Sequence, residues 1–215
     1  PPGFDREILE GFAASKRLRV QPVPIASWDQ LIPALNAGQG DVIAGRFTFT
    51  ETRARSAAFT AQVFPTRNVV VTNAGVRRPI TSVEELRQER LGTVAGSSMA
   101  EAIAAAGVPA AQVDSSYTSV TLVDALRSGK VRAVVLGIER AILLGRRYPE
   151  LQTGLYLGPP GKLAFAVRRE DESLLRDLNA YLTVHRDSGR WSRLLVKYFG
   201  PSAPEVLKKA RAGSD

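Results

Sequence analysis

The chain has no cysteine and a single histidine, His185, among its 215 residues. Without cysteine there is no disulfide, no thiol nucleophile and no cysteine-ligated metal. One histidine cannot build a multi-histidine metal site, and we interpret His185 as an ordinary helix residue rather than a member of a catalytic triad. We therefore expect no metal, no cofactor and no enzymatic activity.

The sequence also lacks long apolar runs and long basic runs. No stretch approaches the about 20 apolar residues that a membrane-spanning helix needs. The net charge is +8, but no basic run reaches five residues and no nucleic-acid-binding motif occurs. We expect a solvated basic surface that favours anionic ligands, and no nucleic-acid partner. The start at Pro1-Pro2-Gly3 carries no signal peptide, as in a processed or trimmed chain.

What is present is typical of a folded α/β protein. Apolar residues make up 44% of the chain, and its length suits one large domain or two small ones. Helical and strand patterns alternate, which predicts a mostly parallel sheet. Asp5 is placed to cap the first helix, Ser27 and Gln30 form a capping-box pattern, and Pro33 should kink the helix that follows. The predicted helices span 5–16, 27–38, 97–106, 119–129, 137–147 and 170–185, with a further start at Ser82, and the predicted strands span 18–24, 42–44, 68–72, 91–95 and 131–136.

The most informative stretch runs from Asp41 to Arg53. The apolar residues 42–44 read as a buried strand, and two threonines and two arginines follow it, namely Thr48, Thr50, Arg46 and Arg53. A guanidinium fork beside hydroxyls and backbone N–H groups suits a small carboxylate. The alternative is a strand that simply runs into a polar surface loop.

The surrounding motifs, taken in order, resemble the extracytoplasmic solute-binding proteins of family 3. These are the polar-amino-acid receptors of ABC importers, and their fold also serves in sensor kinases and murein-degrading enzymes. The resemblance covers nearly the whole chain. Its pieces are Gly3-Phe4-Asp5, residues 27–38, Phe59-Thr60, residues 68–72, residues 92–98, residues 124–135, residues 162–168, Gly189 and residues 197–200.

The resemblance implies a periplasmic-binding-protein type II fold with two lobes and a two-segment hinge. Lobe one would be 1–64 plus 163–215, lobe two 67–159, and the crossovers would lie at about 63–67 and 158–163. A solute would lie in the cleft between the lobes. Two surface loops of a single α/β domain are the alternative. The N-terminal strand that normally precedes Gly3-Phe4-Asp5 in such proteins is not in this sequence, so part of the lobe-one sheet and of the site is expected to be missing.

The resemblance also assigns ligand contacts. Arg53 matches the carboxylate-binding arginine and Thr48 the hydroxyl donor to the same carboxylate, while Arg46 is either a second anion contact or a solvent-exposed side chain. In lobe two, Ser97 and Ser98 begin a helix, where free N–H groups and hydroxyls make an anion-binding corner, although a plain N-cap would need only one serine.

Three further positions complete the predicted site. Phe64, in the first crossover, could line the cleft. Amino-acid receptors of this type usually place an acid directly after the strand that matches 131–136, but here that position is Gly137 and the first carboxylate is Glu139. Either Glu139 holds the ligand ammonium in a shifted register, or the ligand lacks an α-ammonium, because a buried ammonium without a carboxylate is costly.

The resulting prediction is a monomeric receptor, periplasmic or otherwise extracytoplasmic, either free or lipid-anchored. It would close on a small carboxylate-bearing solute and deliver it to an ABC permease. The alternatives are a sensing domain of a larger protein, such as a lytic transglycosylase or a sensor kinase, and a dehydratase-like enzyme that uses Glu139.

Overall fold

A computed structural model describes residues 3–211, and these fall into two compact units. Among the described residues, unit 1 comprises 3–65 and 161–203, and unit 2 comprises 66–160 and 204–211. The chain passes between them at Pro65–Thr66, at Pro160–Gly161 and again at Ala203–Pro204. Residues 204–211 thus group with unit 2, whereas the resemblance had placed them in lobe one.

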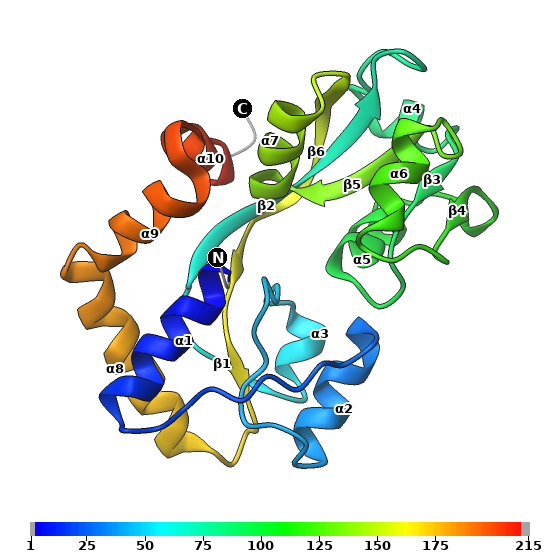
Figure 1. Cartoon of the computed structure of the whole chain (residues 1–215). Coiled ribbons are helices and arrows are strands. Elements are labelled where there is room, and N and C mark those ends of the chain that lie inside the picture. The colour runs from blue at the N-terminus through cyan, green and yellow to red at the C-terminus, as the bar shows by residue number, and fades with distance from the viewer. Residues whose placement is uncertain (1–2, 212–215) are drawn as a thin grey trace. The chain divides into compact units, whose positions relative to one another are not determined.

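The elements alternate as an α/β chain should (Figure 1). In unit 1 the helices are α1 (Phe4–Ser15), η1 (Trp28–Gln30), α2 (Leu31–Asn36), α3 (Glu51–Ala54), α8 (Glu172–Asp187), α9 (Arg190–Phe199) and η3 (Gly200–Ser202). In unit 2 they are α4 (Val83–Leu86), α5 (Ser98–Ala105), η2 (Ala110–Gln112), α6 (Thr121–Arg127), α7 (Ile138–Arg147) and α10 (Ala203–Arg211), whose first residue belongs to unit 1. The strands are β1 (Ala58–Phe59), β2 (Phe64–Asn73), β3 (Leu91–Gly92), β4 (Val113–Asp114), β5 (Ala133–Gly137), β6 (Leu151–Leu163) and β7 (Ala166–Val167).

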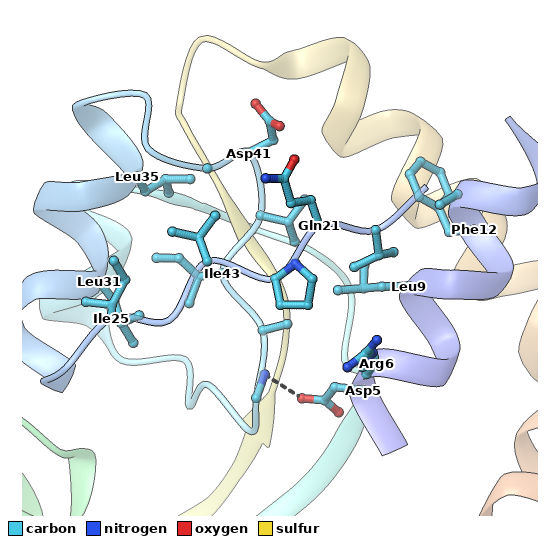
Figure 2. Close-up of a pocket in the computed structure, with 18 of the residues that line it drawn as sticks. Asp5, Arg6, Leu9, Phe12, Gln21, Ile25, Leu31, Leu35, Asp41 and Ile43 are labelled. Carbon is cyan, nitrogen blue, oxygen red and sulfur yellow. Dashed lines mark hydrogen bonds between the residues drawn. The ribbon is translucent and has the colours of Figure 1, made fainter. Parts of the chain in front are cut away.

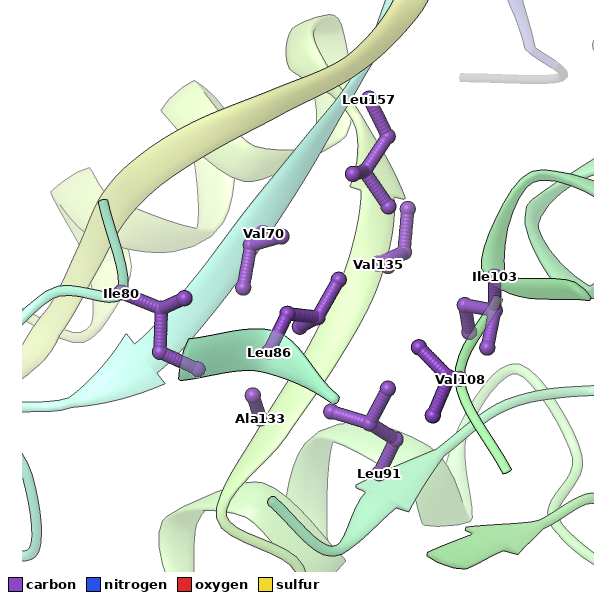
Figure 3. Packing of buried hydrophobic residues seen from close by; sticks show 9 residues of the cluster. All are labelled: Val70, Ile80, Leu86, Leu91, Ile103, Val108, Ala133, Val135 and Leu157. Atoms are coloured by element: carbon purple, nitrogen blue, oxygen red, sulfur yellow. The ribbon is translucent and has the colours of Figure 1, made fainter. Parts of the chain in front are cut away.

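Unit 2 is built on a five-stranded sheet in the order β4-β3-β5-β2-β6. β3 runs parallel to β4 and β5, whereas β2 runs antiparallel to β5, with Val70 opposite Val135. β5 is an apolar run that is buried throughout, and β2 is buried at every position but Asn68 although half of its residues are polar. Figure 3 shows the core on one side of it, where Val70, Val135 and Leu86 meet.

Unit 1 has less regular pairing. Its two-stranded sheet joins β1 to β7 antiparallel, and single antiparallel bridges link Ile43 to Ala166 and Thr48 to Leu163. The predicted mostly parallel sheet is therefore confirmed around β3 but is wrong for these pairs. α1 and α8 pack on them through an apolar cluster that includes Phe165 and Leu178.

Four local predictions for the first 40 residues were wrong. Residues 18–24 form no strand. Asp5 does not cap α1, because its carboxylate accepts backbone N–H groups of another segment, and Ser27 makes no side-chain cap. Pro33 does not kink a helix, since α2 begins only at Leu31 and so places the proline in its first turn, where it is tolerated.

A groove with a cavity volume of about 910 Å³ lies within unit 1 beside residues 42–44. Figure 2 shows Ile43 on its floor, Leu9 and Phe12 of α1 on one side, and the Gln21 segment passing over it. Within the described chain, Val42 and Ala44 have no backbone hydrogen bond, and none joins residues 19–26 to other residues. In place of the predicted strand at 42–44, only Ile43 is paired, through its bridge to Ala166. The backbone groups of Val42 and Ala44 are unpaired within the described chain.

Among residues 3–211, no helix combines the length and the apolarity that crossing a membrane requires.

Candidate ligand-binding site

The first half of the predicted site lies in unit 1, around the short helix α3. Thr50 caps this helix by accepting a hydrogen bond from the Arg53 backbone N–H at 3.3 Å. Arg53 is only 7% exposed, donates from Nη1 to the Thr48 carbonyl at 2.9 Å, and lies 4.3 Å over the Phe47 ring. The contacts hold the guanidinium in one orientation, which is what bidentate binding of a carboxylate requires.

The Phe47 ring under the Arg53 guanidinium belongs to a stack of three aromatic rings. The Phe47 ring is stacked between Trp28 and Phe59, with centroid separations of 6.4 and 5.6 Å. Phe47 is fully buried in the cluster formed with Leu35 and Ile43. The core of unit 1 therefore positions Arg53, and Trp28 packs against this core.

Arg46 sits in the loop between the Ile43 bridge and α3. Its φ of 63° is left-handed, and its backbone N–H donates to Asp5 Oδ2 at 2.6 Å, beside a 3.0 Å bond from Gly45. Burial raises the pKa of the Asp5 carboxyl, and the two N–H donors oppose that rise. Asp5 thus fixes the loop that leads into Thr48, while the Arg46 side chain is exposed.

Phe64 was predicted as a cleft residue, and the structure corrects this. Its side chain is 2% exposed and packs in an aromatic cluster of unit 1 with Phe4, Trp191 and Phe199, at centroid separations of 5.5, 6.1 and 5.2 Å. The strand-like crossover turns the ring inward, where it anchors α9. Phe64 is a core residue and cannot present its ring to a solute without unpacking this cluster.

The second half of the site lies at one edge of the unit 2 sheet. β3 and β5 are parallel neighbours, so the loops after them, which begin α5 and α7, emerge at the same edge. Ser97 is the N-cap of α5 and accepts the Ala100 N–H at 3.2 Å. Ser98 is the first helical residue, with its side chain 7% exposed. Ser97 therefore performs the ordinary capping role, which does not exclude a ligand contact.

Gly137 and Glu139 begin α7 at this edge. The Glu139 carboxylate is 4% exposed, and its Oε2 accepts a hydrogen bond from Thr66 Oγ1 at 2.8 Å. A Cβ built on Gly137 would lie 2.4 Å from Glu139 Oε1 and 2.7 Å from Oε2. The Glu139 carboxylate therefore fills the place where a side chain at position 137 would begin.

Sequence reasoning missed Arg140, the next residue of α7. Its Nη2 donates to the Ser119 carbonyl in the loop that leads into α6, and its side chain is half-buried. The bond joins two helix starts at the same sheet edge as Ser97. A run of Glu and Arg at a helix start gives no signal of this placement, because it depends on where the loop before α6 lies.

The described residues thus form two α/β units, and each unit carries polar side chains at the starts of helices that follow buried segments. This is the periplasmic-binding-protein type II fold. It is shared with the P235GK mutant of ArgBP from T. maritima (TM-score 0.85, 25% identity, covering 92% of this chain and 85% of that one). An ancestral arginine-binding protein bound to arginine is also similar (TM-score 0.81, 26% identity, 92% and 88% covered).

The chain belongs to the bacterial extracellular solute-binding proteins, family 3, whose profile matches residues 1–201. Among curated relatives, the L-arginine-binding protein of Pseudomonas aeruginosa is 29% identical over 211 residues, covering 92% of this chain and 79% of the relative. The membrane-bound lytic murein transglycosylase F of Stutzerimonas stutzeri is also 29% identical, over 205 residues and 92% of this chain. The chain spans 42% of the length of that transglycosylase.

Proposed function

We propose that this protein is a solute-binding receptor whose two half-sites hold one small carboxylate-bearing solute of the amino-acid class. The observation that carries the proposal is Arg53, a buried guanidinium fixed between the Thr48 carbonyl and the Phe47 ring. A planar, permanently charged fork is suited to an α-carboxylate. The hydroxyls of Ser97 and Ser98 at the start of α5 would complete the grip from unit 2.

Glu139 is proposed to bind the ligand ammonium. It is the buried carboxylate at the sheet edge that carries Ser97, and its carboxylate replaces a side chain at Gly137. This favours the shifted register over a ligand without an ammonium. The protein names of the relatives, arginine- and histidine-binding, support an amino-acid solute.

We further propose where the receptor works and to which partner it delivers its solute. The receptor would work outside the cytoplasm as a monomer and would deliver its solute to an ABC permease, since one relative in Haemophilus influenzae is a probable amino-acid ABC transporter-binding protein. We propose binding without turnover as its activity. Closure of the two units on the solute should lower the radius of gyration, and unchanged scattering at saturation would contradict it.

A second role is favoured by one observation, the match to lytic murein transglycosylase F over 92% of this chain but only 42% of that protein. In that role the same site would sense a solute and regulate a larger protein of which this chain is one part. The ligand chemistry would not change, so the binding experiment below tests both roles. The full-length gene and its neighbours distinguish them.

The test is a thermal-shift screen of the chain against amino acids, dicarboxylates, small sugars and muropeptide fragments, followed by calorimetry on every hit. A ligand at 100 times its dissociation constant adds about 2.7 kcal/mol of stability. Arg53→Gln should weaken binding by at least about tenfold, because truncating a buried charged contact costs about 2–5 kcal/mol. Arg55→Gln is the matched control, since Arg55 is exposed two residues further on.

Circular dichroism should show that Arg53→Gln keeps its secondary structure, and Arg53→Lys keeps the charge but loses the planar fork. Both Arg53 variants should bind more weakly than Arg55→Gln. Full affinity in folded Arg53→Gln, or hits among sugars alone, would overturn the proposal.

A further inference from the structure

The side of unit 1 formed by the end of α8 and by α9 is basic, and these two helices are consecutive in the chain (Figure 1). Between residues 178 and 199 the chain holds one acid, Asp187, against four cations, and all five of these residues are exposed. The cations are Arg186, Arg190, Arg193 and Lys197. The last three stand three and four residues apart in α9, a spacing that puts them on one face of the helix.

The opposite face of α9 is fixed toward the core of unit 1. Leu195 is buried, and Trp191 donates from Nε1 to the Val63 carbonyl at 3.1 Å. Tyr198 donates its hydroxyl to a carboxylate of α1 at 2.6 Å. These contacts decide which side of α9 meets solvent. That side presents the three cations together with Val196, which is 66% exposed.

The other acids of α1, α8 and α10 do not neutralise this face. Asp5 of α1 is buried against the loop that follows residue 44, and Glu172 stands at the opposite end of α8. The remaining acids of these helices, apart from Asp187, are in ion pairs: Glu7 with Lys197, Glu10 with Arg6, Asp177 with Lys16 and Glu205 with Lys209. Within residues 3–211, neither Arg190 nor Arg193 takes part in an ion pair.

The composition of the face favours an anionic lipid surface over a folded protein partner. Protein interfaces are usually anchored by aromatic side chains seated in well-packed pockets. Here Trp191 and Tyr198 are engaged inside unit 1, and the exposed large apolar residues of the two helices are the short Val184 and Val196. Clustered cations beside a few apolar side chains are typical of a surface that binds anionic headgroups. Such binding needs no pocket, because the headgroups rearrange around the cations.

We propose that this basic face of α8 and α9 docks on the anionic phospholipid headgroups of a membrane, of the phosphatidylglycerol type. The contact is electrostatic and reversible, and salt weakens it, because exposed charges are screened over about 8–10 Å at physiological ionic strength. The face does not include Arg53, so lipid and solute bind independently. A face that serves solubility alone would show no preference for anionic lipid beyond the effect of net charge.

The experiment is co-sedimentation of the complete chain with vesicles of pure phosphatidylcholine and of phosphatidylcholine mixed with an equal amount of phosphatidylglycerol. The protein should sediment with the mixed vesicles only, and added salt should release it. Arg190→Gln/Arg193→Gln should lower the partition coefficient onto mixed vesicles by at least about tenfold. Arg146→Gln/Arg147→Gln is the matched control, because it removes the same charge from two exposed arginines in the last turn of α7. The control should bind nearly as well as the wild-type protein.

The variant Arg190→Lys/Arg193→Lys tests whether charge or shape is recognised. Lysine keeps the charge and loses the planar fork, so the mixed vesicles should still bind this variant. Circular dichroism should show that all three variants are folded, because the changed side chains are exposed. Sedimentation with both vesicle types, equal losses in the α7 and α9 glutamine variants, or loss of binding in the lysine variant would overturn the proposal. Binding of soluble poly-L-glutamate but of neither vesicle would overturn it in favour of an acidic protein partner.

Discussion

The carboxylate of Glu139 lies against the Cα of Gly137, in the space that a side chain at position 137 would enter. The two positions therefore cannot both place a group there. Position 137, where the resemblance predicted an acid, is glycine in this chain, and the acid Glu139 stands two residues later on α7. A side chain at position 137 would therefore require the Glu139 carboxylate to shift from its buried position.

Moving this carboxylate between the two positions gives the first prediction. Glu139→Ala should weaken amino-acid binding by at least about tenfold. The double variant Gly137→Asp/Glu139→Ala should regain part of the lost affinity, because the new carboxylate enters the space that Glu139 occupied. Calorimetry of the two variants with the same amino acid checks this.

Gly137→Asp alone is the control for that pair, since two carboxylates would then compete for one place and repel each other. It should melt at a lower temperature than the double variant. Equal affinity of Glu139→Ala and the double variant would mean that Glu139 does not hold the ligand ammonium.

Two threonines of β2 should respond in opposite ways to replacement by valine. Thr66 is 4% exposed and donates its hydroxyl to Glu139, so Thr66→Val leaves a buried carboxylate short of one bond. The expected loss of unfolding free energy is about 1–3 kcal/mol. Thr72 is 1% exposed, and its hydroxyl has no hydrogen-bond partner within residues 3–211, so Thr72→Val should be neutral or stabilising. Urea denaturation of both variants measures the difference, and equal losses would refute this account of β2.

His185 should make the stability of the protein fall in mildly acidic solution. Burial, together with the charges of Arg190 and Arg193, lowers the pKa of its imidazole from 6.5, and within the described chain neither ring nitrogen has a hydrogen-bond partner. The unfolded chain therefore takes up this proton at a higher pH than the folded chain. The stabilising contribution is complete above the unfolded pKa and is lost as the pH falls below it toward the folded pKa.

Denaturation of the wild-type protein and His185→Phe at about pH 7.5 and about pH 5 isolates this effect, because other titrating groups are common to both. The wild-type protein should lose more stability on acidification than the variant does. Parallel losses would show that His185 does not contribute to the pH dependence.

The helices of unit 2 could be predicted from sequence because their signals are local. Ser82 caps α4 as expected, α5 lies inside the predicted 97–106, and Gly129 ends the α6 region with a φ of 74°. Residues 18–24 show why strands are harder to predict. Their alternation is real, but a strand also needs a neighbour with which to pair, and the described chain offers none there.

The site was predictable to the extent that its residues follow recognisable turns. Ser97 and Glu139 lie at the starts of predicted helices, whereas the short helix that carries Arg53 was not predicted. The environment of each residue was not predictable, because the Phe47 stack under Arg53 and the loop carbonyl that holds Arg140 come from distant segments. The burial of Phe64 could not be predicted for the same reason, because Trp191 and Phe199, which pack against its ring, lie far along the chain.

The backbone N–H and C=O groups of Val42 and Ala44, beside the groove of unit 1, are free within the described chain to hydrogen-bond with another extended segment. An extended segment whose backbone groups are unpaired on one side, beside an apolar groove, is a template onto which an extended peptide can add by β-augmentation. In concentrated solution the protein should therefore associate through this edge, even if it is monomeric when dilute. Filling the groove with an extended segment should both solubilise unit 1 and slow the exchange of the Val42 and Ala44 amides.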